Sequence, residues 1–356
     1  MRSRVRERIV VAAVAALIAL AIGETGLRLL WHNPYRHESP DHLVRLKKHH
    51  PNADHTYSRA LLSGKDERIR LRTDDRSYIL PSLQYGDPDF TIAFLGGSTT
   101  ECLAVREDLR FPALVSELLS VDGLKINTLN VARSGSNMHD CINVLLNHVV
   151  ADRPDMAVLM EGSNDVGYLR HDGDYRRSMG HAATIRDLAK WLFQMASARS
   201  YTVGLARKSA MRVSLQPENP STDWRQSATP LDSVRAELYR QRVRAFVHIC
   251  RDFGIVPVLM TQPFSDQRTP LTPAWLDATA QDQFNEIVRE VGGAEGVEVV
   301  DLVRYLQGEV PGWKEPNRIF YDAIHVTDNG SQVYARHIAD RLRPLISDGR
   351  QRPSCE

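Results

Sequence analysis

The chain has 356 residues, of which 42% are hydrophobic and 25% are charged, and its formal net charge is +1. This composition is typical of a globular protein with a sizeable core, and it excludes a disordered or fibrous chain. Because the charges balance and no long basic run lies beyond the N-terminus, the sequence excludes an electrostatic nucleic-acid binder.

The first 31 residues predict a membrane anchor. Arginine occupies every second position from Arg2 to Arg8, and an apolar run follows at 9–23. Basic residues ahead of an apolar segment keep the N-terminus in the cytoplasm and direct the following chain outward. We therefore expect the rest of the chain to lie on the extracytoplasmic side of the cell membrane, in the periplasm or outside the cell.

A cleaved signal peptide is the alternative, because a full span needs roughly 20 apolar residues and the small residues Ala19 and Ala21 suit a cleavage site. The helical pattern nevertheless continues to Trp31, which suits a membrane interface. Glu24 and Arg28 are four residues apart and can pair on one helix face. These features favour an uncleaved single-pass anchor, and a buried helix of a soluble domain is the weakest interpretation.

Residues 32–88 are polar and irregular, which predicts a stalk and a short lead-in. The adjacent His49 and His50 lie in this stretch. Neighbouring histidines in a polar segment are more typical of solvated side chains than of a metal site, so we expect no metal there.

The cysteines are few and scattered, and no two of them have the Cys-x-x-Cys spacing. This pattern excludes a disulfide framework and a zinc site. We expect buried free thiols, and a bridge between the two that follow predicted strand ends, Cys102 and Cys141, is the alternative. The other two are Cys250 and Cys355.

From residue 89 onward, apolar runs of strand length alternate with helical segments. The runs are FTIAFLG, LKINTLNV, DMAVLME, IVPVLMTQ and VEVVDL, and the helical segments lie at 107–120, 137–150, 231–253, 279–292 and after Asn329. Continuous apolar strands joined by helices indicate a parallel sheet covered on both faces. We predict an α/β domain over 89–348, a three-layer α/β/α sandwich around a mostly parallel, flavodoxin-like sheet of about five strands.

Polar residues follow the predicted strands where reactive groups gather in such sheets, at the carboxyl ends. Ser98 follows the first strand, Gly135 the second and Asn164 the third, and Asp322 and His325 come in a loop after the last. A serine hydroxyl becomes a nucleophile when a histidine oriented by a carboxylate takes its proton. The Asp-x-x-His spacing lets one loop present both partners to Ser98, and the sequence therefore predicts a catalytic triad.

An oxyanion hole is predicted beside this triad. The negative oxygen of a tetrahedral intermediate needs fixed hydrogen-bond donors. The backbone N–H groups of Ser98 and Gly135 and the side chain of Asn164 would supply them. Gly96 and Gly97 would let the backbone turn sharply and bring the Ser98 amide close to a bound carbonyl.

This order of residues resembles the SGNH, or GDSL-type, hydrolase superfamily. The resemblance covers roughly residues 89–346, and Asp322 completes the triad in the Asp-x-x-His block. The four residues that name the superfamily match here as Ser98, Gly135, Asn164 and His325.

The sequence departs from the family pattern at one position beside the nucleophile. The usual Gly-Asp-Ser is Gly96-Gly97-Ser98 here. The change removes a carboxylate next to the nucleophile but no member of the triad. The stretches RIRLRTDDRSYI, GGSTTE and RFPALVSELL are similar to a membrane-anchored branch found with bacterial cell-surface polysaccharide systems.

Three further residues near the motifs have more ordinary interpretations. Glu101 fits the first turn of a helix, where its charge favours the positive end of the helix dipole. Asp165 either accepts backbone hydrogen bonds in the Asn164 loop or faces solvent. His139 is expected at the surface, at a helix start.

The segment at about 168–230 is a long insertion with an amphipathic helix. Packing against the domain is the expected role of its apolar stripe, formed by Leu188, Trp191, Leu192 and Met195. Its position after the third strand also makes it a candidate lid or substrate-selecting wall.

The resemblance implies a serine esterase that hydrolyses short acyl esters, such as acetyl esters, on a carbohydrate through an acyl-enzyme. One alternative is an O-acyltransferase acting on a cell-surface polysaccharide, and another is a non-catalytic polysaccharide-binding protein. The implied partners are an acylated glycan or small-molecule substrate and the membrane. We expect no organic cofactor and no metal, and the sequence indicates no particular oligomeric state.

Overall fold

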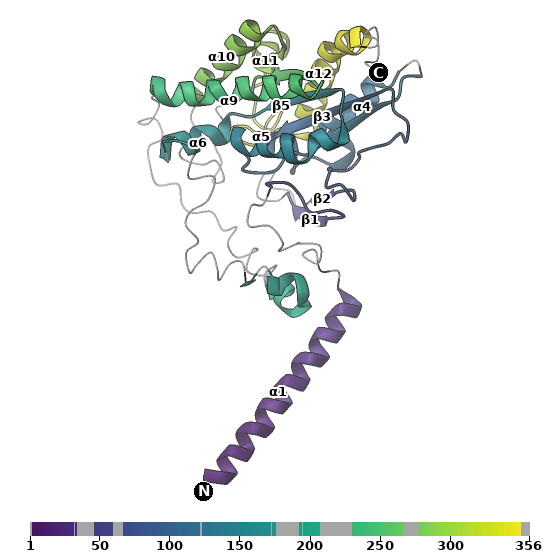
Figure 1. Cartoon of the computed structure of the whole chain (residues 1–356), viewed down its shortest axis with the longest axis vertical. Coiled ribbons are helices and arrows are strands. Elements are labelled where there is room, and N and C mark those ends of the chain that lie inside the picture. Colours follow the sequence, from purple (N-terminus) through teal and green to yellow (C-terminus); the bar gives the residue numbers. More distant parts are fainter. Residues whose placement is uncertain are drawn as a thin grey trace. The chain divides into compact units, whose positions relative to one another are not determined.

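The computed structural model forms two compact units, which are described separately. One unit contains residues 1–44 and 181–216, and the other contains residues 45–180 and 217–356. Figure 1 draws the chain with its helices and strands labelled. The described residues are 2–31, 33, 46–59, 67–121, 123–171, 173–175, 192–193, 195–206, 230–265, 267, 276 and 278–349.

The larger unit is built on a five-stranded sheet in the order β4-β3-β5-β6-β7, and every neighbouring pair is parallel. The first of these strands in the chain, β3, lies inside the sheet with its successors on both sides. This is the flavodoxin-like order, whose switch point opens a crevice at the carboxyl ends of the strands. The strands are β3 (Phe90–Gly96), β4 (Ile126–Asn130), β5 (Met156–Met160), β6 (Val256–Met260) and β7 (Glu298–Val300).

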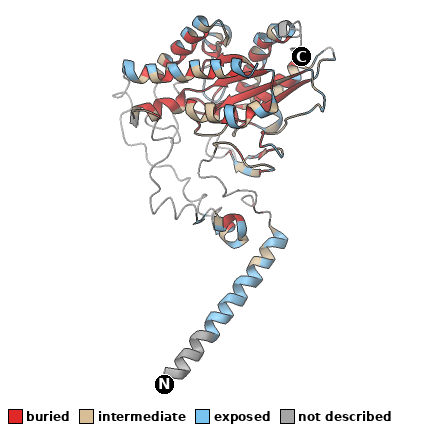
Figure 2. Ribbon diagram, in the orientation of Figure 1, coloured by how far each residue is buried: buried red, intermediate tan, exposed pale blue. Residues whose placement is uncertain are grey.

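Helices cover both faces of this sheet, which confirms the predicted three-layer fold. Along β3, Ile92 and Phe94 pack into one hydrophobic cluster, whereas Ala93 and Leu95 pack into the other. The first cluster also takes side chains from α4 (Phe111–Leu119), α11 (Leu302–Glu309) and α12 (Asp328–Gly349). The second takes them from α5 (Met138–Asn147), α9 (Ser233–Asp252) and α10 (Ala278–Glu295). Figure 2 shows the sheet as buried between these layers.

Shorter elements join the layers at the edges of the sheet. The segment predicted as one helix at 107–120 is a 3-10 turn, η1 (Glu107–Leu109), followed by α4. The division occurs because Pro112 stands in the first turn of α4, where its fixed φ starts a helix. The remaining short elements are α3 (Ser98–Glu101), η2 (Val149–Asp152) and α6 (Ser163–His171).

The lead-in belongs to the same compact unit as the sheet. The lead-in contains two antiparallel strands, β1 (Asp54–Ser58) and β2 (Arg68–Arg72), which precede the sheet in the chain. The backbone N–H of Ile79 then donates to the Asn130 carbonyl of β4 over 2.8 Å. Arg110, which is 1% exposed, donates to the carbonyl of Arg70 over 2.7 Å. These bonds fix the lead-in beside the strands that carry the predicted site.

The smaller unit contains α1 (Arg2–Leu30), of which Val11–Leu30 is long and apolar enough to cross a membrane. The predicted ion pair is confirmed, with Arg28 Nε 3.2 Å from the Glu24 carboxylate. The same carboxylate accepts the backbone N–H of Tyr201 at 2.8 Å and of Thr202 at 3.0 Å. Glu24 therefore satisfies the free N–H groups at the start of the helical turn 201–206.

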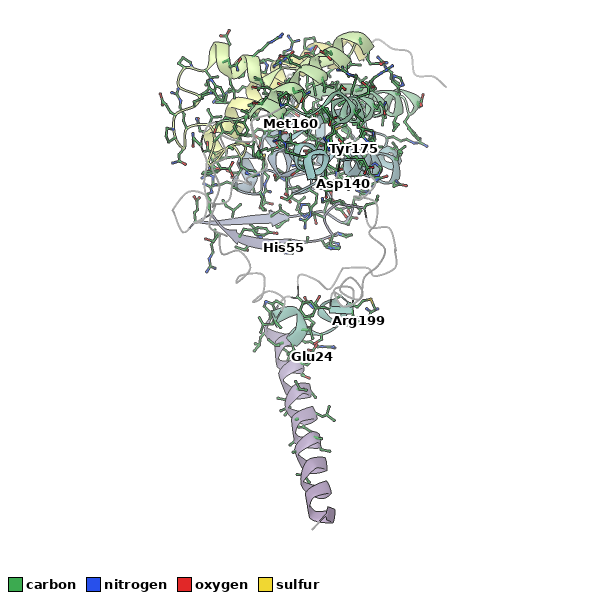
Figure 3. The ribbon with its side chains drawn as sticks, turned by 90° about the vertical axis from the view of Figure 1, so that its left-hand side faces the viewer. Glu24, His55, Asp140, Met160, Tyr175 and Arg199 are labelled. Atoms are coloured by element: carbon green, nitrogen blue, oxygen red, sulfur yellow. The ribbon has the colours of Figure 1, made fainter. Side chains whose placement is uncertain are left out.

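A second contact fastens the insertion to the end of α1. The side chain of Asn33 is buried and donates to the Ser197 carbonyl over 2.7 Å. Figure 3 shows Glu24 and Arg199 side by side in this unit. In the predicted apolar stripe, Leu192 is 52% exposed, whereas Leu188 and Trp191 lie outside the described residues. The lid interpretation of the insertion stays a prediction.

Candidate active site

The turn after β3 has space only for glycine at its last two positions before Ser98. A Cβ added at Gly96 would lie 2.4 Å from the Met160 carbonyl oxygen. One added at Gly97 would lie 2.5 Å from Glu161 Oε2 and 2.6 Å from Asn164 Nδ2. The backbone contact excludes a side chain at Gly96, whereas a side chain at Gly97 would displace the two polar groups, and both contacts show that the ends of β3 and β5 approach each other closely. Met160, the last residue of β5, is labelled in Figure 3.

Ser98, the first residue of α3, meets the predicted histidine and aspartate. Ser98 Oγ lies 2.8 Å from His325 Nε2, and His325 Nδ1 lies 2.8 Å from Asp322 Oδ2. The other carboxylate oxygen, Oδ1, accepts the backbone N–H groups of Ile324 at 2.9 Å and His325 at 2.8 Å. Asp322 is thus held by its own loop, and the three side chains form one hydrogen-bonded chain.

The surroundings favour an ionised Asp322 and a basic His325. Burial raises the pKa of Asp322, but the charge and hydrogen bond of His325 outweigh it and hold the pKa below its usual value. Burial lowers the pKa of His325, but the Asp322 carboxylate outweighs it and leaves the pKa above its usual value. Glu101 adds to that rise. The imidazole can therefore accept a proton from Ser98 and hold it.

Two of the predicted oxyanion residues, Asn164 and Gly135, follow β5 and β4 in the chain. Asn164 Nδ2 donates to the Ser136 carbonyl over 2.7 Å and lies 3.4 Å from Glu161 Oε1. Gly135 has a φ of +75°, a conformation that L side chains rarely adopt, and its carbonyl accepts from Lys47. The structure thus brings Asn164 against the nucleophile turn and places Gly135 in the loop after β4.

Glu101 has the expected place in a first helical turn and, in addition, buried polar partners. It lies in α3 as predicted, but its side chain is 1% exposed and pairs with His49, whose Nε2 is 2.7 Å from Glu101 Oε1. Arg133 Nη1 lies 3.5 Å from the same oxygen, and Ser134 donates to Oε2. Glu101 thus stands in the first turn of a helix as predicted, and these partners also stabilise its charge inside the protein.

The expectation of solvated histidines at 49 and 50 is wrong for His49, which is 3% exposed. Burial lowers its pKa below the usual value. Burial raises the pKa of Glu101, but the hydrogen bond and charge of His49 and the charge of Arg133 outweigh it and leave the pKa lowered. The lead-in thus contributes a buried polar side chain directly behind α3.

Two acidic side chains lie buried close together at the end of β5. Glu161 and Asp165 are 3% and 0% exposed. Asp165 accepts the backbone N–H of Met138 at 3.1 Å and the hydroxyl of Tyr175. Of its two predicted roles, the acceptance of backbone bonds is the one found. Glu161 was not among the predicted site residues, because in the sequence it is only the polar residue after an apolar strand.

The described part of the chain holds neither a cluster of metal-ligating side chains nor a disulfide. No three potential metal-ligating side chains gather there. Cys102, Cys141 and Cys250 are buried free thiols, as expected, so the alternative bridge does not form. Cys355 lies outside the described residues.

Comparisons with solved structures return esterases and related hydrolases. The lipase/acylhydrolase from Enterococcus faecalis is 17% identical, with a TM-score of 0.45 over 72% of this chain and 96% of that one. The acetylxylan esterase from Geobacillus stearothermophilus is 17% identical, with a TM-score of 0.43 over 72% and 94%. An α/β hydrolase from the metagenome of Lake Arreo, Spain, is 17% identical, with a TM-score of 0.42 over 73% and 96%. No curated protein matches the sequence.

The family model of the GDSL-like lipases and acylhydrolases matches residues 94–333. This region spans more than half of the chain and includes Ser98, Asp322 and His325. The match confirms the resemblance predicted from the order of the motifs. The protein therefore belongs to the GDSL-like lipase/acylhydrolase family and is a serine carboxylic ester hydrolase.

Proposed function

We propose that the protein is a membrane-anchored, extracytoplasmic esterase that hydrolyses short acyl esters on a carbohydrate. The observation that carries the catalytic part is the hydrogen-bonded chain from Ser98 Oγ through His325 to Asp322. A binding protein has no need of this arrangement, whereas an acyl-transferring serine requires it.

In the proposed mechanism, His325 Nε2 takes the proton of Ser98 as Oγ attacks the ester carbonyl carbon. The carbonyl π electrons move to oxygen, and the oxyanion accepts from the N–H groups of Ser98 and Gly135 and from Asn164. Asn164 Nδ2 donates to the Ser136 carbonyl over 2.7 Å and to Glu161 Oε1 over a longer 3.4 Å, so its second amide proton would turn from Glu161 to the substrate oxygen. His325 then protonates the departing alcohol oxygen, which leaves an acyl-Ser98.

Water resolves this intermediate by the same steps in reverse order. His325 removes a proton from the water as it attacks the acyl carbon, and then returns the proton to Ser98 Oγ as the ester bond breaks. The products are a carboxylic acid and the regenerated serine. A sugar hydroxyl in place of water would make the protein an O-acyltransferase, so the acceptor alone distinguishes the two activities.

Short acyl groups are favoured by where most of the exposed apolar side chains lie in the described part of the larger unit, and Val234, at the start of α9, is the exception. Leu146 and Phe253 lie at the C-terminal ends of α5 and α9, and Val121 follows α4. Each of these segments leads into the start of a strand, at the opposite edge of the sheet from Ser98. A long acyl chain would need apolar surface beside the nucleophile. The carbohydrate is proposed from the motifs similar to the polysaccharide-associated branch.

The anchor proposal is supported by the contacts of α1. Glu24 and Asn33 hold the described part of the insertion through five hydrogen bonds to its backbone and hydroxyl groups at residue 197 and at 200–202. A segment destined for removal has no need of such contacts near its end. We expect the purified full-length chain to retain its N-terminal residues, which intact mass and extraction of membranes with carbonate will show.

The test of the activity is hydrolysis of p-nitrophenyl acetate, butyrate and octanoate by the full chain in detergent. Ser98→Ala should abolish turnover, because no acyl-enzyme forms, and wild-type turnover should fall with acyl length. Ser347→Ala, which changes an exposed serine of α12, is the matched control and should behave as wild type. Wild-type turnover by Ser98→Ala would refute the mechanism. Acyl transfer to an added sugar in preference to water would identify the transferase.

A further inference from the structure

Glu161 is a carboxyl group that the mechanism above does not use, although it lies against the nucleophile turn. It immediately follows β5 and precedes Asn164 by three residues. Its side chain is buried, and the carboxyl group faces Gly97, the residue before Ser98. A buried carboxyl group is costly unless it is neutral or compensated, so its retention at this place requires a reason.

The two oxygens of Glu161 have unequal surroundings. Oε1 accepts the backbone N–H groups of Gly162 at 3.0 Å and Asn164 at 3.2 Å, and it lies 3.4 Å from Asn164 Nδ2. Oε2 is buried and has no hydrogen-bond partner among the described residues. Oε1 is therefore the acceptor of the group, and Oε2 is the atom that can carry a proton.

Glu161 also fills the space that a side chain at position 97 would need. A Cβ there would come within 2.5 Å of Oε2 and 2.6 Å of Asn164 Nδ2. The usual Gly-Asp-Ser motif has its aspartate at this position, and this chain has Gly97. The glycine and Glu161 are thus complementary, because the carboxyl group can lie beside the nucleophile turn only when position 97 has no side chain.

We propose that Glu161 is a positioning residue that holds Asn164 in the oxyanion hole, supplying from β5 the carboxyl group that the sequence lacks at position 97. Oε1 of Glu161 accepts the backbone N–H of Asn164 and meets the side-chain amide Nδ2 of the same residue. These two contacts hold the amide beside the Ser136 carbonyl until a substrate oxygen accepts a hydrogen bond from the second amide N–H. This inference rests on the proposed function of Ser98, His325 and Asn164.

The neutral carboxylic acid is the active form. An ionised group beside the oxyanion hole would oppose the negative charge that develops on the substrate oxygen. Burial, and secondly the charge of Asp165, raise the pKa of Glu161 well above its usual value. Asp165 accepts from two donors, the Met138 N–H and the Tyr175 hydroxyl, and ionises first. The titratable groups that face Glu161 are Asp165 of α6, Lys47 of the lead-in, Cys141 of α5 and Tyr239 of α9.

Two substitutions in the full chain test this proposal on p-nitrophenyl acetate. Glu161→Gln keeps an acceptor at Oε1 and is always neutral, so kcat should stay within about threefold of wild type. Glu161→Ala removes the support of Asn164, and kcat should fall by about 10- to 100-fold with KM little changed, up to the loss of one oxyanion donor. Glu309→Ala, at an exposed position of α11, is the control for a lost glutamate.

The pH profile gives a readout that a purely structural role would not change. Wild-type kcat should decline at alkaline pH as Glu161 ionises, and Glu161→Gln should lack that decline. Wild-type kcat in Glu161→Ala, or an alkaline decline unchanged in Glu161→Gln, would overturn the proposal. If Glu161→Ala does not fold, the profile of Glu161→Gln alone decides.

The serine control separates this inference from the proposed function. If Ser98→Ala is inactive while Glu161→Ala turns over like wild type, only the role of Glu161 is wrong. If Ser98→Ala remains active, the mechanism itself fails. The rate at which a fluorophosphonate probe labels Ser98 should follow the same order as kcat, with wild type and Glu161→Gln faster than Glu161→Ala.

Discussion

Two buried glutamates lie beside the nucleophile, and their surroundings leave one of them ionised and the other neutral. Glu101, the last residue of α3, has His49, Arg133 and Ser134 around its carboxylate, and its pKa lies below the usual value. Glu161, after β5, has an acidic neighbour and one oxygen without a partner, and its pKa lies well above the usual value. Burial is similar at both sites, so the neighbours decide whether a buried carboxyl group is ionised.

The largest effect should come from breaking the compensated pair. His49→Ala removes the main hydrogen-bond donor of the buried Glu101 carboxylate, which should lower the free energy of unfolding by about 1 to 3 kcal/mol. Denaturant titration of the full chain, followed by tryptophan fluorescence, measures this loss.

An exposed pair provides the matched control for that substitution. His248 lies 3.0 Å from Glu295 but is 52% exposed, and such pairs contribute about 0 to 1 kcal/mol. His248→Ala should therefore cost far less than His49→Ala. Equal losses of stability in the two variants would show that His49 does not stabilise the buried charge of Glu101.

On the Glu161 side, the next largest effect should come from Gly97→Ala. The added Cβ would displace Glu161 Oε2 and Asn164 Nδ2, which lie 2.5 and 2.6 Å from its position. A misplacement of about 1 Å in such a site can cost about 100-fold in rate, so kcat should fall by about that factor. Gly254→Ala, at a glycine with no atom within 4 Å of an added Cβ but with φ of +70°, tests for a general cost of changing a glycine. Unchanged kcat in Gly97→Ala would contradict the tight packing.

The two sites should respond to pH with opposite signs. Glu101 and His49 have lowered pKa values when folded, so the unfolded state binds more protons and stability falls as the pH drops below 6.5 and then below 4.5. Burial raises the pKa of Asp165 from 3.8 to about 7, so the folded state binds more protons and its contribution is lost as the pH rises through that range.

Single substitutions separate these two dependences. Glu101→Gln should reduce the loss of stability in acid, and Asp165→Asn should reduce the loss between about pH 4 and pH 7. Denaturant midpoints measured across this range report both. A Glu101→Gln profile that still matches wild type below pH 4.5 would mean that Glu101 does not carry a lowered pKa.

The sequence predicts the fold and the proposed triad because both follow local patterns. Apolar runs of strand length fix the layers, and Ser98, Asn164 and His325 stand directly at strand ends or in a short motif. The buried glutamates follow no local pattern. His49 lies in a polar stretch, and its burial depends on the packing of the lead-in against β4. The place of Glu161 depends on the lack of a side chain at Gly97, which follows a different strand, β3.

The smallest expected effect distinguishes the two glutamates through His325. Glu101 contributes to the raised pKa of His325, whereas a neutral Glu161 contributes no charge. The acid limb of kcat/KM reports the protonation of the free general base, so its midpoint should lie above 6.5 in wild type. Glu101→Gln should move that midpoint to lower pH, because the imidazolium loses a nearby negative charge. Glu161→Gln should leave it in place. A shift of the acid limb in Glu161→Gln would show that Glu161 is ionised in the free enzyme, and the contrast between the two carboxyl groups would then be lost.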